Sequence, residues 1–291
     1  MHICILLQKE HEEQDDTLLL HGGEYNNRIL FSYNIFNLNK QHWMKTEPLL
    51  GKLVPQLKSH SFGYYKITEK NKAISYIIIS GGITIEHDIK CYNKEFCDCD
   101  NLILSDQIYI YYRETFTPVV LEDKNDFQKT VRRYGHSMFN LANGKLYMIG
   151  GFVQYEGYVI DIIEMNISIK NKVVSCKCNK IELMTNKIKG RMYCSVSVVF
   201  NKIILFGGVR DTRTLNDMWV IDFEDIKNPI TTEVEIDKKV FLPRFGMSTA
   251  TQHDSHDGNL YRIMILGGSY FNDDNFSEGV TNELLVFSVS V

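Results

Sequence analysis

The hydrophobic pattern of the chain repeats five times: a short apolar run leads directly into a pair of glycines. The five segments are 17–23, 76–82, 146–151, 203–208 and 263–268. Their first glycines stand at 22, 81, 150, 207 and 267, so the intervals are 59, 69, 57 and 60 residues. No helical period competes with this pattern over a useful length. A strand-and-turn unit at a nearly constant spacing predicts an all-β chain built from copies of one module.

The third copy shows the module most clearly. Asn143 and Gly144 form a two-residue hairpin signal between two apolar segments. The four strands predicted for this copy are 138–142, 145–149, 158–163 and 172–178. Four antiparallel strands make a sheet with two apolar faces, and neighbouring copies are needed to cover both faces.

The remaining copies follow the same order of strands, so we expect a single domain over residues 1–291. The approximate copies are 1–55, 56–125, 126–186, 187–238 and 239–291. In the first copy, Phe36 and Trp43 are expected on the outer strands. The fifth copy ends with its third strand and shows no outer strand in the sequence.

Three features together resemble the kelch repeat over nearly the whole chain. They are the start Arg133-Tyr-Gly-His-Ser137, the double glycine after the second strand, and the third strand typified by Asn216-Asp-Met-Trp219. The resemblance implies a kelch-type β-propeller in which each repeat forms one four-stranded antiparallel blade around a central axis.

The copies depart from the kelch pattern at several positions. The histidine His136 is matched by His60 but replaced by Cys194 and Met247, and Gly135 is replaced by Ser59 and Tyr193. Tryptophan occurs only at Trp43 and Trp219. Five readable repeats leave three alternatives open: a five-bladed ring, a further sixth blade that is not readable, or an incomplete ring from a truncated product.

Charge and composition exclude several kinds of partner. The chain has 32 basic and 36 acidic residues and a net charge of −4, which disfavours nucleic-acid binding. No apolar stretch approaches the roughly 20 residues that span a bilayer, and the N-terminus lacks the basic start of a signal peptide. An odd number of unevenly spaced cysteines indicates a reducing compartment, so we expect the cytoplasm, with the nucleus as an alternative.

Most of the recurring residues are interpreted as structural. The glycine pairs lack the spacing of a phosphate loop and are expected to let packed backbones turn. Arg133, Arg191 and Arg244 recur at the start of the later copies, and their guanidinium groups have five donors suited to bracing neighbouring blades. His60 and His136 resemble core histidines. The structural set is Gly22, Gly23, Gly81, Gly82, Gly150, Gly151, Gly207, Gly208, Gly267, Gly268, Arg133, Arg191, Arg244, Trp43 and Trp219.

The soft ligands His87, Cys91, Cys97 and Cys99 form the one cluster with a zinc-like composition. The gap between Cys97 and Cys99 is tighter than usual, and Cys176 and Cys178 repeat it on a predicted outer strand, so we expect neither a metal nor a cofactor. No nucleophile, base and orienting group can be assembled from spacing, and the ligands of the kelch-like copper oxidases find no match here. We therefore expect a protein that is not an enzyme and has no identified small-molecule substrate.

The loops that follow the second strands are expected to gather on one face of the propeller. Tyrosine, phenylalanine and arginine interleaved with acids are typical of protein-recognition surfaces. The candidate partner-binding residues are Tyr25, Arg28, Tyr155, Arg210, Asp211, Arg213, Tyr270 and Phe271. They predict a non-catalytic adaptor that binds a partner protein or peptide, as a scaffold, signalling regulator or substrate receptor.

Two alternatives of a different class remain. The missing outer strand of the fifth copy favours the propeller portion of a larger enzyme or complex, such as a kelch-bearing tRNA-modifying methyltransferase. The other alternative is an enzyme that acts on a carbohydrate or small molecule, which metal analysis and turnover assays would test.

Overall fold

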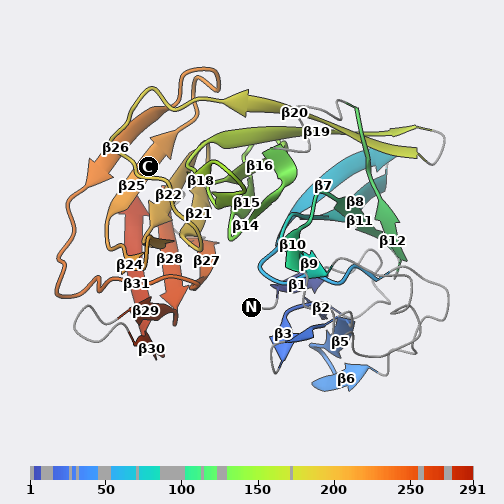
Figure 1. Cartoon of the computed structure of the whole chain (residues 1–291), viewed down its shortest axis with the longest axis horizontal. Coiled ribbons are helices and arrows are strands. Elements are labelled where there is room, and N and C mark those ends of the chain that lie inside the picture. The colour runs from blue at the N-terminus through green and yellow to red at the C-terminus, as the bar shows by residue number, and fades with distance from the viewer. Residues whose placement is uncertain are drawn as a thin grey trace. The chain divides into compact units, whose positions relative to one another are not determined.

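A computed structural model describes most of the chain. The described residues are 3–7, 16–25, 28–30, 33–44, 54–69, 72–85, 102–112, 115–122, 130–170, 173–254, 259–271 and 277–290. Strands make up the architecture, as Figure 1 shows, and the prediction of four-stranded antiparallel sheets is confirmed. Among these residues, no helix is long and apolar enough to cross a membrane.

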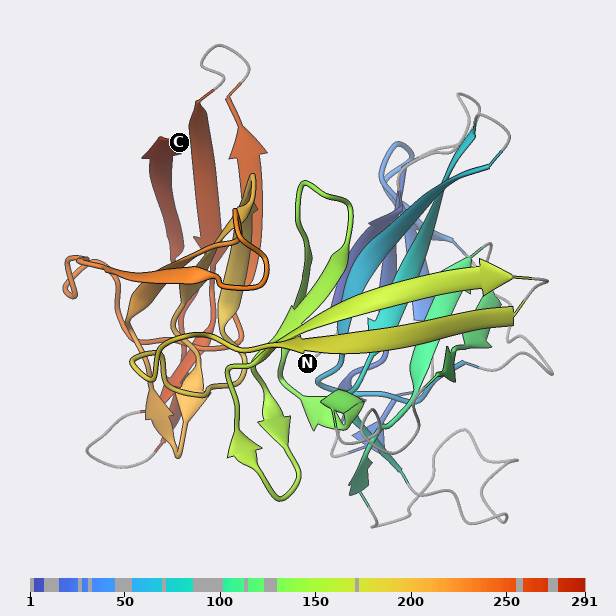
Figure 2. The same cartoon turned by 90° about the horizontal axis from the view of Figure 1, so that it is seen from above.

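The contacts divide the chain into two compact units. The first contains Met1–Tyr134 and Ile167–Lys177, and the second contains Gly135–Asn166 and Cys178–Val291. The long hairpin of β19 (Ile162–Lys170) and β20 (Val173–Ile181), visible in Figure 2, supplies residues to both units.

The first unit holds two four-stranded sheets. The first sheet consists of β1 (Ile3–Leu7), β2 (Thr17–His21), β5 (Tyr33–Asn37) and β6 (His42–Met44), in that order. The second consists of β7 (Ser61–Glu69), β8 (Lys72–Ser80), β11 (Ile108–Tyr112) and β12 (Thr115–Pro118). Strand β13 (Val120–Leu121) runs parallel to β20. Leu19, Ile35 and Ile77 lie in one apolar cluster that joins the two sheets.

The second unit contains the later copies. Strands β15 (Ser137–Asn140) and β16 (Leu146–Ile149) pair in order with β19. The fourth sheet is β21 (Ser195–Val199), β22 (Lys202–Phe206), β25 (Met218–Asp222) and β26 (Ile230–Val234). The fifth is β27 (Ser248–His253), β28 (Leu260–Leu266) and β31 (Leu284–Ser290).

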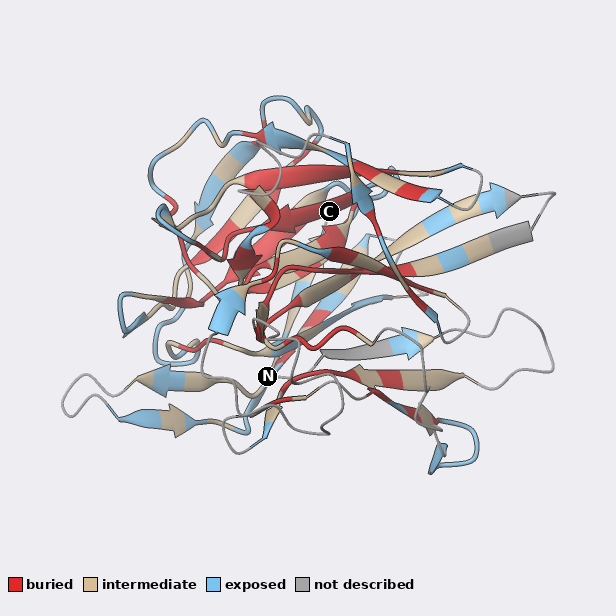
Figure 3. Cartoon of the chain, turned by 45° about the vertical axis from the view of Figure 1, so that its right-hand side comes forward, coloured by how far each residue is buried: buried red, intermediate tan, exposed pale blue. Residues whose placement is uncertain are grey.

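Both faces of the fourth sheet are covered. Ile203 and Leu205 of β22 pack toward the strands of the third copy, while Ile204 and Phe206 pack toward the fifth. This alternation follows from the two-residue period of a strand, which sends successive side chains to opposite faces. Figure 3 shows the resulting buried strand interiors.

The glycine pairs connect each sheet to the next copy in the chain. The N–H of the second glycine donates to the carbonyl of the residue that opens the next copy: Gly23 to Leu57, Gly82 to Arg133, Gly151 to Arg191 and Gly208 to Arg244, at 2.8–2.9 Å. All ten glycines have positive φ. At Gly208 a Cβ atom would lie 2.9 Å from the Met192 carbonyl oxygen and 3.1 Å from the Cβ of Cys194, so the backbone approach leaves no room for a side chain.

Pairs of short antiparallel strands follow the glycine pairs, where the sequence predicts loops. They are β3 (Glu24–Tyr25) with β4 (Arg28–Ile29), β9 (Ile83–Ile85) with β10 (Leu102–Leu104), β17 (Phe152–Val153) with β18 (Gly157–Tyr158), β23 (Val209–Arg210) with β24 (Arg213–Thr214), and β29 (Ser269–Phe271) with β30 (Glu278–Val280). The remaining short strand is β14 (Arg133–Tyr134). The candidate partner-binding residues therefore lie within or next to these short strands.

Candidate functional site

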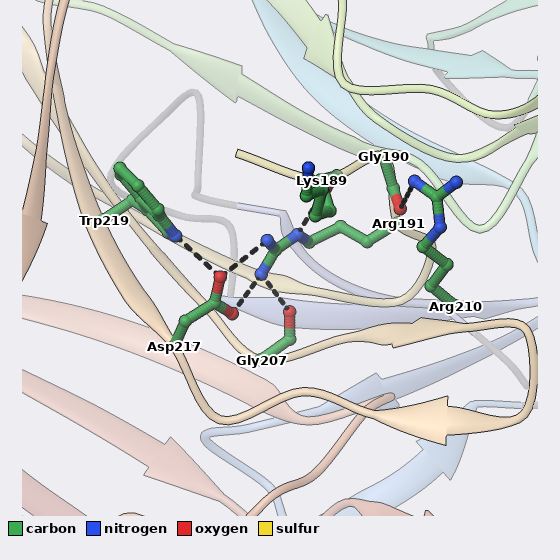
Figure 4. Close-up of polar contacts among 7 residues, drawn as sticks. All are labelled: Lys189, Gly190, Arg191, Gly207, Arg210, Asp217 and Trp219. Atoms are coloured by element: carbon green, nitrogen blue, oxygen red, sulfur yellow. Dashed lines mark hydrogen bonds and ion pairs between the residues drawn. The ribbon is translucent and has the colours of Figure 1, made fainter. Parts of the chain in front are cut away.

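A buried arginine supports the base of the β23–β24 hairpin (Figure 4). The Arg191 guanidinium is fully buried and pairs with both carboxylate oxygens of Asp217, with Nη2 to Oδ2 at 2.8 Å. Its Nη1 also donates to the carbonyl of Gly207 at 3.1 Å, and Trp219 Nε1 donates to Asp217 at 2.7 Å. Burial alone would raise the pKa of Asp217, but the hydrogen bonds and charge of Arg191 hold the pKa below its usual value.

The arginines that open the third and fifth copies are also buried. Arg244 Nη2 pairs with Glu283 at 2.8 Å, and Arg133 Nε donates to the Thr130 carbonyl at 2.7 Å. The ion pairs of Arg191 and Arg244 lie within their own copies. The connection to the preceding copy runs instead through their backbone carbonyls, which accept from the glycine N–H groups.

The β23–β24 hairpin has an unfavourable turn. Asp211 and Thr212 form its two-residue turn with φ of 47° and 63°, and Arg210 lies directly opposite Arg213. A turn with two positive φ values normally takes Asn-Gly, and a β-branched residue with positive φ is an outlier. Like charges directly opposite each other also destabilise a hairpin. Local stability therefore does not explain these residue types, and such strained positions often mark functional sites.

Two contacts hold the Arg210 side chain. Its Nε lies 3.2 Å from the Asp211 carboxylate, and its Nη1 donates to the Gly190 carbonyl at 3.5 Å, as Figure 4 shows for the latter. Arg213 is exposed, and within the described part of the chain no hydrogen bond or ion pair involves its side chain. The turn thus presents one guanidinium held in place and one directed at solvent.

The neighbouring β29–β30 hairpin adds aromatic surface. The Phe271 N–H donates to Thr214 Oγ1 at 2.9 Å, which joins this hairpin to β24. The Phe271 ring stacks on Phe245 with centroids 5.2 Å apart, and Tyr270 covers Gly279 on the opposite strand. We call Arg210, Asp211, Arg213, Tyr270 and Phe271 the hairpin surface. The structure brings these five predicted residues together within the second unit.

The other three predicted binding residues are placed elsewhere. Tyr155, at the turn of β17 and β18, is 95% exposed, and no described contact joins it to the hairpin surface. Tyr25 is 66% exposed and pairs through its backbone with Arg28 in the first unit. Tyr25 and Arg28 belong to the first unit and the hairpin surface to the second, so the sequence prediction of one continuous binding face stays a prediction.

The two tryptophans occupy different environments. Trp219 is buried in the core of the second unit, next to Asp217. Trp43 is 58% exposed and makes an edge contact with Phe36 at 5.1 Å, across the β5–β6 pair.

A buried histidine pair is a feature that the sequence reasoning missed. His21 Nδ1 and His60 Nε2 lie 3.0 Å apart in the first unit, and the His21 ring packs 5.1 Å from Phe116. Burial lowers the pKa of His21 from 6.5 to about 4, although a hydrogen bond with the Pro55 backbone opposes the shift. The sequence signal that could have pointed to this pair is His21 itself, which stands directly before the first glycine pair. His60 and His136 are both buried.

The described residues contain no cluster of three or more histidine, cysteine or acidic groups able to hold a metal. His87, Cys91, Cys97 and Cys99 lie outside the described residues. On β20, Cys176 is buried and Cys178 is half-buried. Burial raises the pKa of the Cys194 thiol, which keeps it protonated and a poor nucleophile or ligand.

Repeated antiparallel sheets, in each of which the second strand ends at a glycine pair with positive φ that precedes a pair of short strands, define the kelch propeller class. Residues 75–290 match the family model described as the KLHDC2/KLHL20/DRC7 Kelch-repeats domain, and the chain belongs to this family. The structure of YjhT is similar, with a TM-score of 0.58 and 10% identity over 94% of this chain and 78% of that chain. This likeness supports the fold alone. No curated protein matches the chain.

Proposed function

We propose that the chain is a non-catalytic binding module whose hairpin surface recognises a partner protein or peptide. The observation that carries the proposal is the junction of two hairpins, where the Phe271 N–H bonds to Thr214. This bond joins β24, which contains the exposed Arg213, to β29, which contains the exposed Tyr270. Tyrosine and arginine are enriched in the residues that dominate binding energies at protein interfaces.

The supports under the hairpin surface favour recognition. The Arg191–Asp217 ion pair supports the β23–β24 hairpin, and the Phe245–Phe271 stack supports the β29–β30 hairpin. Because both hairpins are held in place before a partner binds, less conformational entropy is lost on binding. The hairpin surface itself contains one carboxylate and two guanidinium groups, without a cysteine, serine or histidine to serve as nucleophile or base. We propose a scaffold, regulator or substrate-receptor role in the cytoplasm or nucleus, compartments compatible with the buried Cys194 thiol.

Affinity purification with quantitative mass spectrometry tests the proposal. The tagged chain is compared with an Arg210→Ala/Tyr270→Ala double variant and with Lys227→Ala. Lys227 is exposed between β25 and β26, at the end of β25 away from the hairpins, and serves as the control.

We expect one stoichiometric protein partner whose recovery falls at least about tenfold in the double variant, the size expected when central aromatic and arginine contacts are lost. Recovery with Lys227→Ala should match the unmodified chain. Equal recovery with all three proteins, or equal loss in the control, would contradict the proposed surface. Thermal unfolding of each variant shows whether the hairpins remain folded.

A further inference from the structure

The turn of the β23–β24 hairpin exposes a threonine hydroxyl next to two arginines. Thr212 is exposed at the tip of the turn, and its Oγ1 donates to the carbonyl of Asp211 directly before it. A threonine with a φ of 63° is unfavourable, because its branched side chain crowds the backbone in this conformation. The turn conformation therefore does not account for a threonine at this position.

The two arginines beside the turn point to one face of the hairpin. Arg210 and Arg213 lie directly opposite each other in the strand pair. Residues in this relation share a face, with Cβ atoms about 4.5–5.5 Å apart. Asp211 contacts Arg210 Nε at 3.2 Å, whereas the described residues offer the Arg213 side chain no hydrogen bond or ion pair. The arginine pair therefore has a positive charge that no described acid balances.

A second threonine of the hairpin is in the opposite situation. Thr214 is half-buried, and its Oγ1 accepts the Phe271 N–H at 2.9 Å. This bond joins the two hairpins, so the Thr214 hydroxyl is engaged within their junction. Of the two threonines in this hairpin, Thr212 is therefore the one that presents its hydroxyl to an enzyme in solution.

We propose that Thr212 is a phosphorylation site whose phosphate is held by Arg210 and Arg213. A protein kinase transfers the γ-phosphoryl group of a nucleoside triphosphate: the bond from Oγ1 to phosphorus forms, and the bond from phosphorus to the β–γ bridging oxygen breaks. The hydroxyl proton passes to a base of the kinase, and the nucleoside diphosphate leaves. The phosphate adds about two negative charges and three acceptor oxygens. Guanidinium groups bind such oxygens bidentately, so the two opposed arginines gain a shared partner.

The surroundings of Thr212 suit a kinase whose substrate groove is acidic. Arg210 stands two residues before the threonine, and Arg213 follows it directly. Arg210 also bonds to the Gly190 carbonyl at 3.5 Å, and the residue before this glycine, Lys189, adds a further exposed positive charge (Figure 4). Such charges complement an acidic groove. Each strand of the hairpin has two residues, so opening the turn for a kinase disrupts few backbone bonds.

Phosphorylation of the purified chain by arginine-directed serine/threonine kinases with magnesium ATP tests the acceptor residue. Tandem mass spectrometry should place phosphate on Thr212 and none on Thr214. Thr212→Ser should keep the acceptor, whereas Thr212→Ala should lose it, and unchanged urea midpoints verify that both variants are folded. Phosphate confined to other residues, or no incorporation by any kinase of this class, would overturn the proposal.

Phosphorus NMR on a chain with phosphothreonine incorporated at residue 212 during synthesis tests the arginines independently of any kinase. Because positive charge favours the dianion, the phosphate pKa should lie at least about 0.5 below that of phosphothreonine in a short peptide. Arg210→Ala/Arg213→Ala should remove most of this difference. The matched control is phosphothreonine in place of Thr232, exposed on β26 beside Glu233, where the pKa should not be lowered. An equal pKa at the two positions would refute the role of the arginines.

The modification also has a consequence for recognition. The phosphate occupies two guanidinium groups of the hairpin surface, so phosphorylation should release the partner. This consequence rests on the proposed function, whereas the modification and its arginine contacts do not. Partner recovery should fall at least about tenfold with phosphothreonine at residue 212 and stay unchanged with phosphothreonine at residue 232. A lowered phosphate pKa together with unchanged recovery would contradict the proposed function and support the modification site.

Discussion

At the scale of single residues, one position of the opening motif keeps the same backbone conformation in four copies although its residue type changes. The third position of the opening motif is Ser59, Gly135, Tyr193 and Gly246 in successive copies. All four have φ between 56° and 67°. Glycine adopts this conformation easily, whereas serine and tyrosine do so at a cost, so the surrounding structure enforces it. The N–H of Tyr193 donates to the Gly135 carbonyl, and that of Gly246 to the Tyr193 carbonyl, which explains why the position tolerates substitution.

The Arg191–Asp217 pair gives the clearest prediction at this scale. Asp217→Asn removes the charge opposite a fully buried guanidinium, so we expect the free energy of unfolding to fall by roughly 2–4 kcal/mol. Urea unfolding followed by tryptophan fluorescence measures the loss, since Trp219 bonds directly to Asp217. The matched control is Asp211→Asn, an exposed carboxylate that should change stability by less than about 0.5 kcal/mol. Similar effects from both variants would show that the buried pair has no special role.

At the scale of elements, the sheets of each unit meet through side chains far apart in the sequence. His21 ends β2 of the first sheet, and His60 directly precedes β7 of the second. Their 3.0 Å contact needs one nitrogen to donate and the other to accept, which two neutral imidazoles satisfy. The contact joins the two sheets of the first unit at their glycine ends.

Stability of the first unit should therefore depend on pH. His21 has a folded pKa of about 4, below its ordinary value of 6.5, so the unfolded chain binds more protons between these values. The stabilisation from His21 is complete above pH 6.5 and is lost as the pH falls toward 4. We expect about 2 kcal/mol less stability at pH 5 than at pH 7.5.

Urea titrations at the two pH values measure this difference, and His21→Asn serves as the comparison because it cannot titrate. The dependence should be smaller by about the same 2 kcal/mol in His21→Asn. An identical pH dependence in both proteins would contradict a neutral, buried His21.

The sequence predicted some elements well for identifiable reasons. The strands around Asn143 and Gly144 were predictable because a strong turn signal separates two apolar runs. The predicted two-residue turn was wrong, because β15 ends at Asn140, β16 begins at Leu146, and only Gly144 of the pair has positive φ. The β23–β24 hairpin was not, because its strands have two residues each and its turn is Asp211-Thr212. The His21–His60 contact spans 39 residues, so no local pattern reveals it. Burial of Trp219 and exposure of Trp43 likewise depend on packing between sheets.

At the scale of the whole molecule, the kelch family assignment explains the repeated sheets, and the hairpins distinguish one end of each sheet from the other. The second unit gathers five candidate residues on two joined hairpins, while Tyr25 and Arg28 belong to the first unit. We therefore propose that recognition uses the hairpin ends of the fourth and fifth sheets, which the Arg191–Asp217 ion pair and the Phe245–Phe271 stack support.

Amide hydrogen exchange on the complex with the purified partner tests this claim most directly. We predict slower exchange in residues 209–214 and 269–271, which form the β23–β24 hairpin and the adjacent strand β29. Exchange in residues 223–229, between β25 and β26, should stay unchanged because they lie at the other end of β25. Protection confined to residues 223–229, with both hairpins exchanging as in the unbound chain, would contradict the account.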